Sequence, residues 1–97
     1  MDKQEFNQLF GEFVQYKRSI EKGWSQTDLA LRMSNNFQNI SRLERGKVSP
    51  TLYWFRGLAE AFEINNVQFY TELEKFIEQR QQGTHMIDIN TPPVTKI

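Results

Sequence analysis

The chain of 97 residues is long enough for one ordinary domain and too short for two. It has no cysteine, which excludes disulfides, thiolate metal sites and cysteine nucleophiles, and its single histidine, His85, excludes a multi-histidine metal centre. We therefore expect neither a metal nor a cofactor. No apolar run approaches the ~20 residues needed to cross a membrane, and the first residues are too polar for a signal peptide, so we expect a cytoplasmic protein with no membrane partner.

Charge is unevenly distributed along the chain, although the formal total is zero. Residues 1–13 carry a net −2, residues 14–56 a net +5 and residues 57–97 a net −3. A basic middle between two acidic ends predicts one face that binds nucleic acid and another that is turned away from it.

The spacing of apolar residues predicts helices from the start of the chain. A 3–4 periodicity indicates a first helix over 2–18, and Gly23 supplies the left-handed residue that ends this region. Ser25 and Asp28 have the spacing of a capping box, which predicts a second, short helix over 26–33.

Two further helices follow in the middle of the chain. Asn36 is a good N-cap for a helix over about 37–45, which Gly46 closes. Ser49–Pro50 is expected to open a fourth helix, with Ser49 as the cap and proline at the first helical position, and its apolar stripe runs to about residue 62.

A fifth helix is expected over about 66–82, ended by Gly83. The remaining residues, 83–97, are expected to form an extended tail with at most a short strand, because 86–89 alternate between apolar and polar and a proline pair follows. The predicted fold class is all-α, with five helices and a short extended C-terminal tail.

The second and third predicted helices have the proportions of a helix-turn-helix. After the inward-facing positions are assigned, an outer face of amides, a hydroxyl and arginines remains on the third helix, and these groups can hydrogen-bond to base edges in the major groove. The remaining residues are Phe37, Gln38, Asn39, Ser41, Arg42 and Arg45.

These residues resemble the phage-repressor-like (Cro/CI, also called XRE) DNA-binding domain over about residues 13–70. The resemblance rests on three segments: Gly23-Trp24-Ser25-Gln26-x-x-Leu29-Ala30, Ile40-Ser41-Arg42-Leu43-Glu44-Arg45-Gly46-Lys47, and Pro50-Thr51-Leu52 with Phe55, Leu58-Ala59 and Phe62. It implies a five-helix, lambda-repressor-like domain over 1–82, with the motif at 25–46.

The resemblance also implies roles for individual residues. Base contacts are expected from Phe37, Gln38 and Arg42, and phosphate contacts from Gln26, Asn36, Arg45 and Lys47. Glu44 matches the family's glutamate that pairs with an arginine of the first helix.

Three departures from the family pattern leave alternatives open. Ser34–Asn35 stands where the turn usually has glycine and an apolar residue. Phe37 replaces a polar residue, so it either touches a thymine methyl or enters the core. The spacing from the first helix to Gly23 is one or two residues long, which leaves open whether Lys17 or Arg18 meets Glu44.

The resemblance implies a sequence-specific regulator of transcription, expected to act as a repressor, that binds double-stranded DNA as a homodimer and has no enzymatic site. The apolar stripe on the fifth helix is expected to form the dimer contact, through Phe69, Leu73, Phe76 and Ile77, with Tyr53, Trp54 or the tail as possible additions. The alternatives are a restriction–modification controller, an antitoxin that autoregulates its operon and binds a toxin through the tail, and a protein-interaction module that has lost DNA binding.

Overall fold

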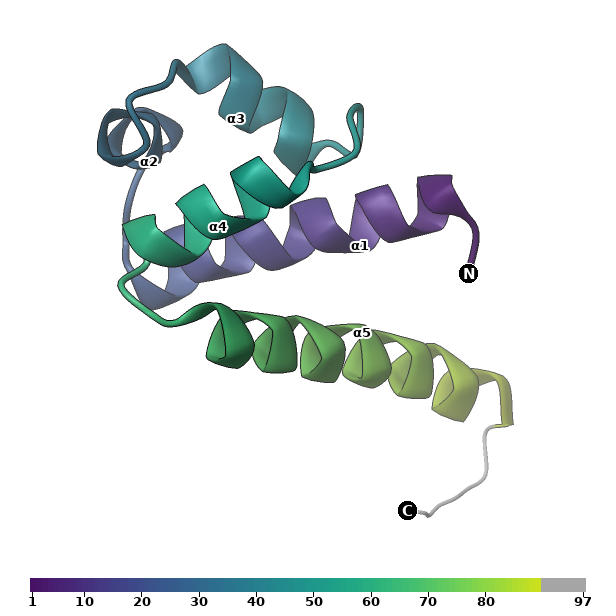
Figure 1. Cartoon of the computed structure of the whole chain (residues 1–97). Coiled ribbons are helices and arrows are strands. Elements are labelled where there is room, and N and C mark those ends of the chain that lie inside the picture. Colours follow the sequence, from purple (N-terminus) through teal and green to yellow (C-terminus); the bar gives the residue numbers. More distant parts are fainter. Residues whose placement is uncertain (90–97) are drawn as a thin grey trace.

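The computed structural model describes the backbone of residues 1–89 and the side chains of residues 1–82, and this part of the chain is helical with no strand (Figure 1). Five α-helices and one π-helical segment follow in the order α1 Lys3–Gln15, η1 Tyr16–Glu21, α2 Gln26–Arg32, α3 Phe37–Glu44, α4 Leu52–Ala61 and α5 Asn66–Ile89. The expected all-α class is confirmed. The expected boundaries of the two motif helices agree with the structure to within one residue.

The first helix is longer than expected because it continues as a π-helix to Glu21 instead of ending at residue 18. A π-turn takes up one more residue than an α-helical turn. This segment lies just before Gly23, where the chain is one or two residues longer than the family pattern. The extra length is thus absorbed inside the helix and not in a loop.

The N-caps follow local sequence rules. The capping box is present: the Ser25 hydroxyl accepts from the Asp28 N–H at 3.0 Å, and the Asp28 carboxylate accepts from the Ser25 N–H at 2.9 Å. The expected cap of α4 is wrong, since Thr51 and not Ser49 accepts from the Trp54 N–H, at 3.1 Å. Thr51 is the hydroxyl residue three positions before that donor, and Pro50 therefore precedes the cap.

Four helices end on a residue with left-handed backbone, whose successor donates its N–H back into the last turn. Two of these residues are glycines, which adopt this conformation without strain, and two carry side chains, which adopt it at a cost. Their φ angles are +70° at Gly23, +52° at Ser34, +73° at Gly46 and +63° at Glu63.

Helix α5 corrects the expected C-terminal tail. It passes through Gly83 and continues to Ile89, so the expected helix end at 82 and the possible strand at 86–89 are wrong. One glycine costs a helix about 1 kcal/mol, which does not end it, and the next helix-breaking residue in the sequence is Pro92. Residues 90–97 of the expected tail lie outside the described residues.

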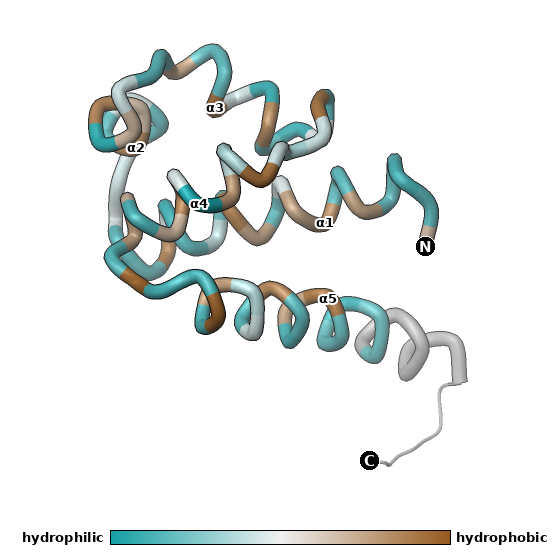
Figure 2. Tube along the Cα trace, in the orientation of Figure 1, coloured by the Kyte–Doolittle hydropathy of each residue, from teal (hydrophilic) through white to brown (hydrophobic). Residues whose placement is uncertain are grey.

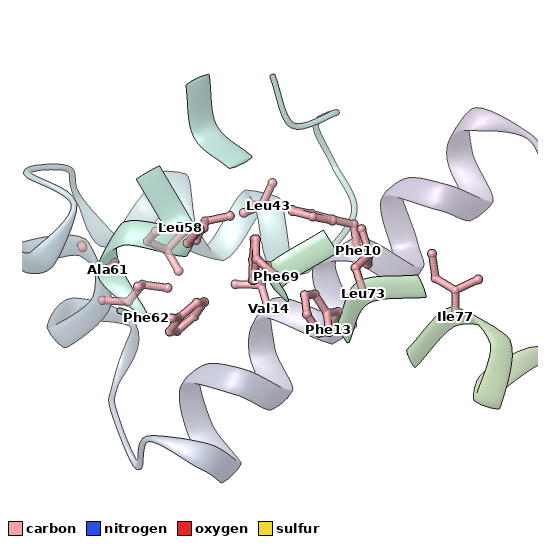
Figure 3. Packing of buried hydrophobic residues seen from close by; sticks show 14 residues of the cluster. Phe10, Phe13, Val14, Leu43, Leu58, Ala61, Phe62, Phe69, Leu73 and Ile77 are labelled. Carbon is pink, nitrogen blue, oxygen red and sulfur yellow. The ribbon is translucent and has the colours of Figure 1, made fainter. Parts of the chain in front are cut away.

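The core lies between α1, α4 and α5 and includes buried residues of both motif helices, with four phenylalanines among its buried members (Figure 3). Phe69 of α5 is at its centre, with its ring centroid 4.8 Å from that of Phe55, 5.3 Å from that of Phe13 and 6.0 Å from that of Phe62. Along the coloured part of the helices in Figure 2, apolar positions recur between polar ones, as expected for helices with one buried side.

This packing changes the expected dimer surface. Phe69, Leu73 and Ile77 are buried inside the chain itself, so they are not available to a second subunit, and the expectation of a contact through them is wrong. Phe76 is half-buried against the Phe13 ring, 5.5 Å away between centroids. An apolar stripe on one helix indicates that another surface packs against it. Here that surface is formed by α1 and α4 of the same chain.

Candidate nucleic-acid interface

The turn between α2 and α3 is held by amide side chains. Asn36 caps α3 by accepting from the Asn39 N–H at 2.9 Å. The Asn35 side-chain oxygen accepts from the Asn36 N–H at 2.8 Å and from the Asn39 side-chain amide at 2.7 Å. Hydrogen bonds of Asn35 thus replace the apolar anchor usual at this place, and Ser34 takes the left-handed position without being glycine.

The inner side of α3 packs against α1 at very close range. Ile40 and Leu43 enter the core, and the backbone at the end of α3 lies directly over Gly11. A Cβ built on Gly11 would be 2.5 Å from the Glu44 carbonyl oxygen and 2.6 Å from that of Leu43. The sequence analysis missed Gly11. A glycine inside a strongly periodic helix is the signal that could have identified this crossing.

A buried ion pair holds the end of α3 to the first helix. Arg18 donates through Nε and Nη2 to the two carboxylate oxygens of Glu44, at 2.7 and 3.0 Å, and through Nη1 to the Trp24 carbonyl at 2.7 Å. Gln26 donates its side-chain amide to the same carboxylate at 3.0 Å. Arg18 is therefore the partner of Glu44. The two parallel bonds fix the orientation as well as the distance of α3.

The neighbouring Lys17 points to α5 instead. Its ammonium donates to Glu21 at 2.8 Å and forms an ion pair with Glu72, beneath the rings of Phe13 and Phe62. Burial alone would lower the pKa of Lys17, but the hydrogen bonds and charges of Glu21 and Glu72 outweigh it and raise that pKa above its ordinary value. Two adjacent residues of η1 thus contact different helices: Lys17 pairs with α5 and Arg18 with α3.

The outer side of α3 and the turn after it carry the predicted contact residues, and all of them are exposed except the half-buried Gln26. On a helix of 3.6 residues per turn, positions 37, 38, 41, 42 and 45 span about 140° of the circumference. Within the described part of the chain, Arg42, Arg45 and Lys47 form no ion pair, and Glu44 is neutralised by Arg18. The Arg45 Nε donates to the Ser41 carbonyl at 3.4 Å, which holds this side chain along α3. This face is therefore positive.

Phe37 belongs to this outer face. Its side chain is 49% exposed and lies outside the core cluster, so the alternative that it enters the core is excluded. Gln26 and Asn36 each use one polar group to stabilise the motif: the Gln26 amide donates to Glu44, and the Asn36 side-chain oxygen caps α3. Their phosphate contacts, like the other DNA contacts, stay predictions.

None of the helices described by the structure combines the length and the apolar character needed to span a membrane.

Comparisons with known proteins agree with this geometry. The family model described as "Helix-turn-helix" matches residues 15–65, which include η1, the motif and all of α4. No curated protein sequence matches the chain.

Similar solved structures include three structures of two controller proteins. The restriction-modification controller protein C.AhdI from Aeromonas hydrophila is 25% identical with a TM-score of 0.64, and the match covers 71% of this chain and 99% of that chain. The wild-type restriction-modification controller protein C.Esp1396I is 28% identical, with a TM-score of 0.66 over 76% of this chain and 95% of that chain. A mutant of the latter gives 29% identity, a TM-score of 0.65, and coverage of 75% and 96%.

The matched segment contains the capped turn, the bidentate Arg18–Glu44 pair and the exposed basic face of α3, and it spans more than half of the chain. The chain therefore belongs to the helix-turn-helix family of phage-repressor-like (XRE) DNA-binding domains, and it is a DNA-binding transcription regulator.

Proposed function

We propose that this protein binds double-stranded DNA sequence-specifically, as a homodimer on a two-fold symmetric operator, and regulates transcription by occupying that site. The observation that carries the proposal is the outer face of α3, where Gln38 and Arg42 are exposed beside the positive charges of Arg45 and Lys47. The inner face of the same helix is fixed to the first helix by the Arg18–Glu44 pair. A rigid helix with free donors on one side is what major-groove readout requires.

Each side chain on this face has a matching chemical partner on DNA. Arg42 can donate two parallel hydrogen bonds to guanine, and the Gln38 amide matches the donor and acceptor of adenine. Arg45, Lys47, Gln26 and Asn36 are proposed to hold phosphates on either side.

A dimer is needed because one recognition helix covers only a few base pairs, too few to select one site among the ~10⁶–10⁹ competitors in a genome. Two copies place two helices about 34–36 Å apart, in successive major grooves. The same basic face then contacts both half-sites of one operator.

The dimer contact is proposed on an apolar strip that crosses α4 and α5. Leu52 and Val67 are 75% and 77% exposed, and Tyr70 is 55% exposed. Leu52 lies one turn before Phe55, whose ring centroid is 6.4 Å from that of Tyr70, and Val67 lies one turn before Tyr70. These four residues form a continuous surface, and a second copy of the same surface would remove it from water.

The dimer is tested with Leu52→Glu. Glutamate at the first position of α4 suits the helix N-terminus, so the fold is retained, but the charge cannot be buried in an apolar contact. Sedimentation is expected to show monomers at concentrations where the wild type is dimeric. Leu31→Glu, at a comparably exposed leucine of α2, is the matched control and should stay dimeric. A dimeric Leu52→Glu protein places the contact elsewhere.

Among regulators of this kind, we favour a controller of restriction–modification genes over an antitoxin. The three structures named above represent two restriction-modification controller proteins, at 25–29% identity over most of this chain. Mapping the bound DNA in the source genome tests this: sites beside restriction and methyltransferase genes support it, and sites beside a toxin gene favour the antitoxin.

DNA binding itself is tested by selecting sites from random duplexes and then measuring affinity at several salt concentrations. Arg42→Ala should relax the selected sequence at a cost of about 1–3 kcal/mol in discrimination at one base pair per half-site. Lys47→Ala should weaken specific and scrambled DNA alike and lower the salt slope by about one per subunit. Lys75→Ala, at an exposed lysine of α5, should change neither. A protein that selects no sequence and shows no salt-dependent binding is an interaction module instead.

A further inference from the structure

Phe37 is the exception among the phenylalanines of this chain. Of eight phenylalanines, seven belong to the core cluster or pack against it. Phe37 does neither, it is 49% exposed, and no other ring pairs with it among the described residues. Half of this side chain is therefore open to a partner, and its place in the fold decides which partner can reach it.

The position of Phe37 selects the kind of complex. It is the first residue of α3, directly after the Asn36 cap, and it shares the outer face with Gln38 and Arg42. The N-terminal residues of a recognition helix are the ones that approach base edges most closely. Phe37 is therefore placed at the DNA and not at the strip on α4 and α5.

The chemistry of a phenyl ring then limits what it can recognise. It has no hydrogen-bond donor or conventional acceptor, so it cannot read the polar edge of any base. The apolar group that the major groove offers is a methyl on pyrimidine C5, carried by thymine or by methylated cytosine.

We propose that Phe37 is a specificity-determining residue that reads a C5-methyl group at one pyrimidine position in each half-site. This inference rests on the proposed DNA-binding function and names the group on DNA that Phe37 contacts. Burying one methyl-sized group is worth about fourfold in affinity per half-site, and about fifteenfold when both half-sites change.

The test uses the operator obtained by selection, with thymines replaced singly by deoxyuridine in both half-sites. This replacement removes the methyl and leaves every hydrogen-bonding group in place. At one position the wild type should lose about fifteenfold in affinity, and Phe37→Ala should bind the thymine and uracil duplexes equally. Gln38→Ala is the control and should keep the wild-type ratio, since it removes an amide beside the same groove.

A second arm distinguishes the two sources of the methyl. With a C·G pair at the same position, 5-methylcytosine should bind the wild type about fourfold better per half-site than cytosine, and Phe37→Ala should not distinguish them. Specific binding without any uracil-sensitive position, or an unchanged thymine preference in Phe37→Ala, would overturn the inference and leave the proposed function standing. Absence of any selected sequence would overturn both.

Discussion

The close crossing of α1 and α3 makes Gly11→Ala the sharpest test of how the recognition helix is held. The added Cβ would lie 2.5 Å from one backbone carbonyl oxygen of α3, 2.6 Å from another and 2.8 Å from a carbonyl carbon. Ordinary contacts of this type begin near 3.4 Å, so the two backbones must separate by most of an ångström. Backbone atoms, unlike a side chain, have no rotamer in which to escape.

The size of the effect follows from two opposing contributions. Overpacking a tight contact costs about 1–3 kcal/mol, and a clash with backbone belongs at the upper end. Replacing glycine by alanine inside a helix returns about 1 kcal/mol through propensity. The expected net loss is about 2 kcal/mol, or roughly 8–16 °C in Tm for a domain of this size.

Gly57→Ala is the matched control. Gly57 also lies inside a helix, but its added Cβ meets only the end of the flexible Met33 side chain, at 3.3 Å. This variant should be neutral or more stable by up to about 1 kcal/mol. Thermal unfolding followed by circular dichroism measures both proteins, and operator affinity reports whether α3 has moved. If Gly11→Ala is as stable as Gly57→Ala, the proposed close packing of α3 on α1 is incorrect.

Two further predictions concern stability. Ser34→Gly should stabilise the protein by about 0.5–1 kcal/mol, because relief of the left-handed strain exceeds the extra chain entropy of glycine; urea unfolding measures it, and a loss of stability would contradict the strained turn. Burial alone would raise the pKa of Glu72, but its hydrogen bonds with Lys17 and Gln68 outweigh burial and lower that pKa. The ionised Glu72 therefore stabilises the fold above its unfolded pKa near 4.5, and this stabilisation is lost as the pH falls through the lower folded pKa. Glu72→Gln should cost about 1 kcal/mol at pH 7 and progressively less toward pH 3, whereas the exposed Glu74→Gln should follow the wild type at every pH.

Local signals in the sequence predicted the motif well because the interactions that shape it are local. The caps of α2 and α3 depend on a residue and its neighbour three positions later, and both Ser25 and Asn36 cap as expected. The predicted end of α5 was wrong because no local signal settles it. Gly83 is compatible with both a C-cap and a helix interior, and nothing beside it in sequence decides between them.

Properties that depend on the partner of a surface were harder to predict. The stripe of Phe69, Leu73 and Ile77 indicated correctly that one side of α5 is covered, but periodicity carries no information on whether the cover is the same chain or a second subunit. Phe37 shows the opposite case. Sequence left the core and the groove equally open, and the exposure of its ring in the structure excluded the core.

The π-helical segment explains why the partner of Glu44 could not be assigned from spacing. In a regular α-helix each residue advances 100°, and adding one residue to the turn shifts every later side chain around the axis. Lys17 and Arg18 lie within this segment, where Lys17 pairs with Glu72 of α5 and Arg18 with Glu44 of α3, so one turn of helix contacts both elements. A buried ion pair adds little net stability compared with apolar packing, but its geometry is satisfied in one arrangement only. The Arg18–Glu44 pair is therefore best understood as setting the position of the recognition helix, with the aromatic core supplying the stability on which that position depends.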